Sequence, residues 1–450
     1  MSDEFRPIYS VWTRRRLAAA ALVILAAAGL LSIRDRIPDI VRGRYLPFVG
    51  KRYPFPGPVA VAGETAIKVI LTAFDTPWGE VVVAQSRARG TDDARLDRAK
   101  RVFLDHLRGD RTLVRIFERI LVLLPLEPAG LDEVLYQFTV ANRYFSAAGL
   151  PVRIDAGLGE RTIPDGSRKA VFLPTAFRLA GEVRVRTDGT AHRLFLLEKH
   201  DHLNISSTSR GRADMESGEG WLLLSDMEWQ FESVLEALSA VPPRYNLKAK
   251  KGSHRELSSR LAAAISNAYS SDGRIRVRDF LSDNIRSIAV HEGRHLADRG
   301  LGRLLLVAAG SRLGRYSEER RNEIATEMRA YLSQLAQAGP ELPMVLAGLC
   351  EHLLGLAEGE RELYGVVAYH VLLMVMGRDE PEGADTAGAL IWTIAEALPL
   401  SSDEVRSAAR RGYESMFGSF EQVDIEDPHG EIARAAALME KRMAERAAAE

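Results

Sequence analysis

A pattern with the residue types and spacing of a metal site lies in the stretch IAVHEGRHLAD, residues 288–298. His291 and His295 are four residues apart, which on an α-helix places both imidazoles on one face, about one turn apart. Imidazole nitrogens at that spacing can bind one Zn²⁺ ion, and the carboxylate of Glu292 would then reach a water on the metal rather than the metal itself. The pattern predicts His291 and His295 as zinc ligands and Glu292 as the catalytic base.

A third ligand is expected from a helix predicted over residues 318–338, with Ser317 as its N-cap and Gly339-Pro340 as its stop. Two glutamates of this helix, Glu323 and Glu327, lie one turn apart on one face. Either carboxylate suits zinc. The one that does not bind the metal would hold a histidine ring in the correct tautomer.

With these residues the chain resembles the gluzincin group of zinc metallopeptidases, in which HExxH on one helix is joined by a Glu from a second helix. In that group the ligand is commonly followed by a small residue three positions on, which favours Glu327, because Ala330 follows it at that distance. Glu323 remains an alternative, because NEIATE is similar to the thermolysin-like Asn-Glu-x-x-Ser-Asp pattern. The resemblance covers about residues 280–340. It implies a zincin-like core, a zinc cofactor and a peptide or protein substrate.

Three further residues are candidates for supporting roles. Asp298 lies on the same helical face as His291, two turns on, and would accept a hydrogen bond from a ligand imidazole. Tyr331, one turn beyond Glu327, and His370, in the apolar stretch YGVVAYHVLLMV, are candidate hydrogen-bond donors to a transition state. The alternative for His370 is a histidine of the core.

Two residues inside the motif, Gly293 and Arg294, depart from the group's usual uncharged pair. A glycine inside a helix costs about 1 kcal/mol relative to alanine. The side chain of Arg294 is expected to point away from the metal, towards solvent or a carboxylate.

The elements that would position the site are predicted to be mostly helical, in an α+β fold. Strands are expected at AIKVILTAF (66–74) and GEVVVAQS (79–86), and several more between 150 and 226, around a polar loop at 207–219. Helical periodicity covers 91–147 and most of the chain after 227, including a motif helix over 283–299 with Ser282 or Asp283 as N-cap. The expected division is a cytoplasmic N-terminus 1–16, a transmembrane anchor 17–33, a linker 34–65, a mixed α/β region 66–250, zincin-like catalytic helices 251–340, a C-terminal helical region 341–420 and a charged helical tail 421–450.

Composition narrows the class of protein. The 450 residues are 46% hydrophobic and 27% charged with a net charge of -1, which indicates a globular chain and no nucleic-acid partner. Cys350 is the single cysteine, so the chain forms no internal disulfide and no zinc site with two of its own thiolates.

A membrane anchor is predicted at residues 17–33, LAAAALVILAAAGLLSI, which carry no charge and follow Arg14, Arg15 and Arg16. A helix of that length rises about 25 Å, just short of a bilayer core, and flanking arginines can extend its reach. The arginines favour a cytoplasmic N-terminus and a single pass through the inner membrane, with the bulk of the chain in the periplasm or outside. The alternatives are a cleaved signal peptide and a buried apolar helix.

These patterns together predict a membrane-anchored bacterial zinc metallopeptidase. The alternative is a non-catalytic, membrane-tethered interaction or scaffold protein whose HEGRH is structural or degenerate. A third hypothesis is a metal-dependent hydrolase that acts on a bond other than a peptide.

Overall fold

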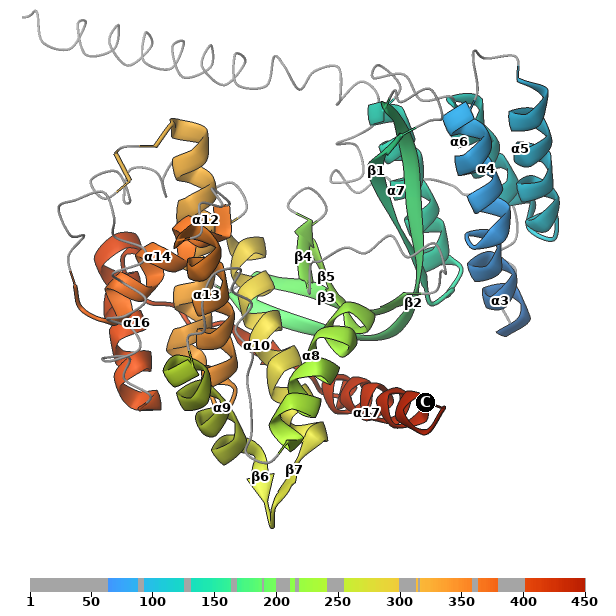
Figure 1. Ribbon diagram of the computed structural model, residues 1–450. Helices are drawn as coiled ribbons and strands as arrows, with labels where there is room; N and C mark the ends of the chain where they lie inside the picture. The colour runs from blue at the N-terminus through green and yellow to red at the C-terminus, as the bar shows by residue number, and fades with distance from the viewer. Residues whose placement is uncertain are drawn as a thin grey trace, which may run out of the picture.

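The computed structural model in Figure 1 describes twelve stretches of the chain. They are residues 64–87, 93–124, 131–162, 168–187, 190–199, 211–214, 218–240, 255–298, 313–314, 316–357, 363–378 and 401–449. The fold is mostly helical with one small mixed sheet, so the predicted α+β class is confirmed at that level.

A group of five helices precedes the sheet and has its own apolar core. Its centre is aromatic: Trp78 stacks on Phe74 with ring centroids 5.7 Å apart and meets the edge of Phe103 at 4.8 Å. Such offset and edge contacts stabilise a core beyond the area they bury. The helices are α3 (Glu64–Ala73), α4 (Thr76–Arg87), α5 (Ala94–His106), α6 (Arg111–Val122) and α7 (Leu131–Ala147).

The strands predicted at 66–74 and 79–86 are wrong, because these residues form α3 and α4. A short apolar run fits a buried strand and a buried helix equally well. Ile67, Ile70, Leu71 and Phe74 are all buried, and their spacing is that of one helical face. Pro77 lies in the first turn of α4, where proline is tolerated.

The sheet connects this helical group to the rest of the molecule through one long strand, β2 (Arg168–Thr187). The first half of β2 pairs with β1 (Val152–Thr162), and after a register shift between Leu179 and Gly181 the second half pairs with β3 (Thr190–Lys199). The strand order is β1-β2-β3-β5-β4, with β8 (Asp424–Glu426) also on β2. β3 and β5 (Glu219–Leu223) run parallel, and β4 (Gly211–Asp214) pairs antiparallel with β5.

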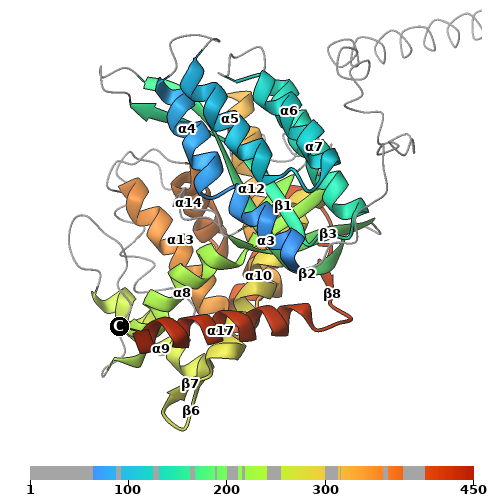
Figure 2. The ribbon, with the colours of Figure 1, turned by 90° about the vertical axis from the view of Figure 1, so that its right-hand side faces the viewer.

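The remaining helices share a second, larger core with β2, β3 and β5. Helix α10 (Val277–Ala297) lies at its centre, against the sheet, α12 (Glu318–Gln337) and α17 (Glu431–Ala449), as Figures 1 and 2 show. The other members are α8 (Leu224–Ser239), α9 (Arg255–Tyr269), the hairpin β6 (Ser270–Ser271) and β7 (Arg274–Ile275), α13 (Leu342–Ala357), α14 (Leu363–Val375) and α16 (Ser402–Phe417).

Several boundaries differ from the predictions. The motif helix begins at Val277 rather than at 283, and Asp283, instead of capping it, accepts a hydrogen bond from the Tyr269 hydroxyl at 3.2 Å. The polar loop predicted at 207–219 contains strand β4. The predicted charged tail is α17, whose buried face packs on α10 and the sheet (Figure 2). The N-cap Ser317 is confirmed, since its hydroxyl accepts from the amide of Arg320 at 3.3 Å.

In the described ranges no helix is both long enough and apolar enough to span a bilayer. Residues 17–33, where the anchor is predicted, and their flanks at 1–16 and 34–63 lie outside those ranges.

Candidate metal centre

Three side chains from two neighbouring helices bring their donor atoms together. On α10, His291 Nε2 and His295 Nε2 are 3.1 Å apart, which their spacing on one helical face allows. On α12, Glu327 Oε2 lies 3.4 Å from the first nitrogen and 3.6 Å from the second. Among the described residues this is the group whose ligand atoms could hold one metal ion.

The three distances fit a tetrahedral ion. Donor atoms about 2.1 Å from one tetrahedral centre lie about 3.4 Å from each other, which is the middle of the observed range. Glu327 Oε2 is buried and makes no hydrogen bond with any described residue, so a cation among the three atoms would satisfy it. Two imidazole nitrogens and one carboxylate oxygen are donors that Zn²⁺ accepts, and three protein ligands leave a fourth position for water or substrate.

The charge balance of the site favours a positive ion at this point. Burial alone would lower the pKa of His295, because it disfavours the charged imidazolium. The close contact with Glu327 and the negative charge of its carboxylate outweigh this effect and raise the pKa of His295 to about 9. Burial likewise opposes ionisation of Glu327, yet the imidazoles of His291 and His295 lower its pKa below the ordinary value. The field that stabilises a proton here would also stabilise a divalent cation.

The structure brings Glu327, rather than Glu323, to the histidines. Glu323 is half exposed and forms an ion pair with Arg320 at 3.1 Å, one turn earlier on α12. Its carboxylate therefore contacts Arg320 rather than either histidine ring. No contact in the structure supports its predicted roles as the alternative ligand or as the residue that orients a histidine.

Glu292 is held between its own helix and the sheet. Its side chain is buried, and burial raises the pKa of its carboxyl. Strand β4 passes directly over it: a Cβ placed on Gly211 would lie 2.6 Å from both Cγ and Oε1 of Glu292. The backbone of β4 approaches the carboxylate this closely because residue 211 has no side chain.

The two unusual residues of the motif dock α10 onto its neighbours. A Cβ on Gly293 would lie 3.1 Å from side-chain carbons of Val185 and Val423, so glycine permits the close approach of α10 to β2. Arg294 points away from the ligands as predicted, but into the interior rather than towards solvent or a carboxylate. It is fully buried, and it donates from Nε to Ser333 Oγ at 3.1 Å and from Nη2 to the carbonyl of Glu421.

The predicted supporting residues have different surroundings. Asp298 is buried, but its Oδ1 is engaged by Arg329 Nη1, so its influence on His295 is exerted through its charge. Tyr331 lies at the site, with its ring edge-on to that of His291 at 4.6 Å between centroids. His370 is buried in α14 among aromatic rings, 5.3 Å from Tyr369 and 6.2 Å from Tyr316, which matches the alternative of a core histidine.

Tyr364, at the start of α14, lies within electrostatic reach of the site and is not identified by the sequence analysis. Burial, followed by the negative charges of Glu327 and Glu292, raises the pKa of its hydroxyl to about 12. Its ring stacks on His352 at 5.3 Å and it remains 41% exposed. A hydroxyl that stays protonated at neutral pH can donate a hydrogen bond to a ligand. No local motif marks it, because α14 reaches the site only through tertiary packing.

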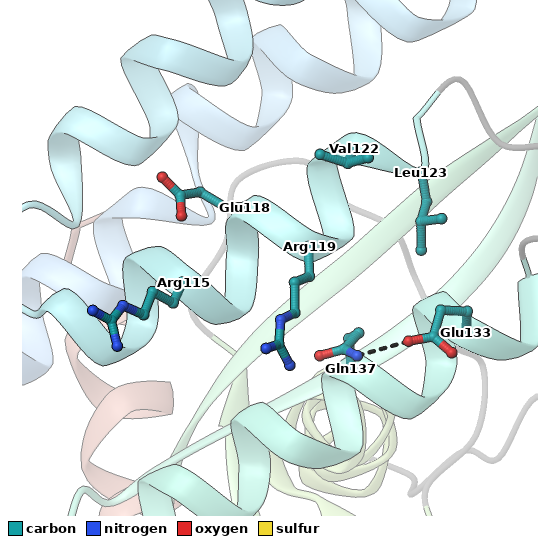
Figure 3. Close-up of a pocket in the computed structure, with 7 residues that line it drawn as sticks. All are labelled: Arg115, Glu118, Arg119, Val122, Leu123, Glu133 and Gln137. Carbon is teal, nitrogen blue, oxygen red and sulfur yellow. Dashed lines mark hydrogen bonds between the residues drawn. The ribbon is translucent and has the colours of Figure 1, made fainter. Parts of the chain in front are cut away.

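A separate hollow of about 490 Å³ lies between α6 and α7 (Figure 3). Its lining is Arg115, Glu118, Arg119, Val122, Leu123, Glu133 and Gln137. It contains no histidine and, among the described residues, no second group with metal-binding geometry. Among the described residues, the candidate metal ligands thus lie on α10 and α12.

Comparison of the chain with protein-family models, with curated proteins and with solved structures found no match.

Proposed function

We propose that this chain is a zinc-dependent metallopeptidase with a zincin-like core of the gluzincin type. The observation that carries the proposal is the convergence of His291 Nε2, His295 Nε2 and Glu327 Oε2 to within 3.6 Å of one another across two helices. These residues would hold the ion. Bound there, zinc would polarise a carbonyl group and lower the pKa of a coordinated water.

Glu292 is the proposed proton carrier. Its carboxylate would take a proton from the attacking water and return it to the leaving amine nitrogen. Burial raises the pKa of Glu292 above its ordinary value, which favours uptake of a proton by its carboxylate. The Tyr364 hydroxyl would donate a hydrogen bond to the oxygen on which negative charge develops.

Strand β4 favours a peptide as the substrate. It is the last strand of the sheet, with β5 on one side and no described strand on the other. An extended peptide can add to such an edge through main-chain hydrogen bonds. Because Gly211 of β4 lies directly over Glu292, a peptide paired with this edge would pass beside the proton carrier.

We further propose that the enzyme acts in the bacterial cell envelope, tethered by residues 17–33, with the site on the periplasmic or outer side. The support is the uncharged stretch and the arginines before it.

Metal content and cleavage test the proposal together. Purified full-length protein should contain about one zinc per chain, since one three-ligand site is proposed. His291→Ala should lose the zinc, and Glu292→Gln should keep it but no longer cleave a fluorogenic casein. A metal-free chain without cleavage would contradict the proposal and favour the interaction or scaffold protein instead. A Glu292→Gln variant with wild-type activity would refute the role of Glu292.

A further inference from the structure

A buried polar clamp joins the two helices that carry the proposed ligands. Arg329 of α12 donates from Nη1 to Oδ1 of Asp298, which is the C-cap residue of α10. It also donates from Nε to the hydroxyl of Tyr413 on α16 at 2.7 Å. All three residues are nearly inaccessible, with exposures of 6%, 2% and 0% for Arg329, Asp298 and Tyr413. A guanidinium presents its donors in a rigid planar fork, so these two bonds fix the direction of the Arg329 side chain.

The clamp lies close to a ligand on each helix. Asp298 comes three residues after His295, and Arg329 two residues after Glu327. On α12 this spacing turns Glu327 and Arg329 to different sides of the helix, one facing the histidines and the other facing α16. A shift of α12 along α10 would therefore move the clamp and the third ligand together.

A second buried contact supports the same pair of helices. Arg294, between the two histidines, donates to Ser333 of α12, and its guanidinium lies 5.5 Å from the centre of the Tyr413 ring. The Arg329 guanidinium lies 5.4 Å from the centre of that ring. Tyr413 thus contacts a buried arginine of each ligand-bearing helix.

We propose that Arg329, Asp298 and Tyr413 are positioning residues for the metal centre, setting the place of Glu327 relative to His291 and His295. The inference rests on the proposed zinc site and adds that α16, far from the motif in sequence, is required for its geometry. Metal sites are sensitive to such support, because metal–ligand distances vary by only about 0.2 Å. Removing a partner that orients a ligand typically weakens metal binding by about 10–100-fold.

Zinc affinity of full-length variants tests the clamp. Arg329→Lys keeps the positive charge but cannot reproduce the two fixed bonds, and we expect zinc binding about 10–100-fold weaker in competition with a chromophoric chelator. Tyr413→Phe removes only the hydroxyl, should fold, and should weaken binding less. The visible spectrum of the Co²⁺-loaded variants should also change, because it reports coordination geometry.

Arg406→Gln is the matched control. Arg406 also ties α16 to α12, donating to the carbonyl of Ala338 at 2.9 Å, but at the end of α12 far from Glu327. It should lower the melting temperature without changing zinc affinity. The positioning role would be refuted if both clamp variants kept the wild-type zinc affinity and Co²⁺ spectrum. It would also be refuted if Arg406→Gln lost as much affinity as they do. Either result would leave the proposed function standing. A wild-type chain that binds no zinc would overturn the proposed function and this inference with it.

Discussion

Replacing Gly211 by alanine should abolish most of the proposed peptidase activity without removing the proposed metal. The new Cβ would stand 2.6 Å from Cγ and Oε1 of Glu292 and 2.8 Å from its Cδ, whereas ordinary contact begins at 3.4 Å. Either Glu292 or strand β4 must therefore move by about 0.8 Å, since carbon atoms do not approach more closely at reasonable energy. The backbone angle φ of Gly211 is not in the left-handed region, so alanine causes no conformational strain that would confuse the result.

A displacement of that size is large for a catalytic carboxylate. Misplacement by about 1 Å can cost about 10²-fold in rate, and we expect a fall of that order in kcat/KM. The three atoms nearest to a Cβ on Gly211 all belong to Glu292 and none to a proposed ligand, so zinc content should stay at the wild-type level. Steady-state kinetics on a fluorogenic peptide, with metal analysis of the same sample, measures both quantities.

Gly348→Ala provides the control for this substitution. Gly348 lies in α13, and a Cβ there meets nothing within 4 Å. The same chemical change should leave activity unchanged and stabilise the helix by about 1 kcal/mol. If Gly211→Ala retained wild-type kcat/KM, the position assigned to Glu292 beneath β4 would be wrong.

Three further outcomes are expected. Tyr364→Phe should lower kcat by at least about tenfold in steady-state assays, because it removes one oriented donor to the developing oxyanion; an unchanged kcat would exclude that role. Gly293→Ala gains about 1 kcal/mol of helix propensity, but its new Cβ would lie 3.1 Å from side-chain carbons of Val185 and Val423. Such crowding typically costs about 1–3 kcal/mol, so urea unfolding should show a small net loss of stability. A more stable variant would show that α10 can move away from β2. Zinc at about 100 times its dissociation constant should stabilise the fold by about 2.7 kcal/mol, so a chelator should lower the melting temperature of the wild type but not of His291→Ala.

The features that the sequence predicts correctly depend on the spacing of residues close together in the chain. His291 and His295 share a face of any helix that contains them, so their convergence needs no tertiary information. Glu327 was identifiable because it belongs to a strongly helical segment that follows soon after the motif, and because a family resemblance favoured it over Glu323. The N-cap Ser317 was likewise a local signal.

The remaining features depend on contacts between distant segments. Gly211 begins β4, a strand of only four residues that lies in a polar stretch and pairs with β5. Four residues are too few to show an alternating pattern, so the sequence does not reveal this strand. Arg294, predicted to point towards solvent or a carboxylate, is instead buried, because Ser333 and the carbonyl of Glu421 from distant segments accept its hydrogen bonds. Tyr364 and Tyr413 reach the site region only because α14 and α16 pack on α12.

An anomalous diffraction map, recorded at the zinc absorption edge from crystals of the zinc-loaded protein, tests the proposed metal site most directly. We expect one peak, about 2.0–2.2 Å from His291 Nε2, His295 Nε2 and a carboxylate oxygen of Glu327, with Glu292 outside bonding distance. A peak elsewhere, or imidazole rings that turn away from Glu327 with no metal between them, would contradict it.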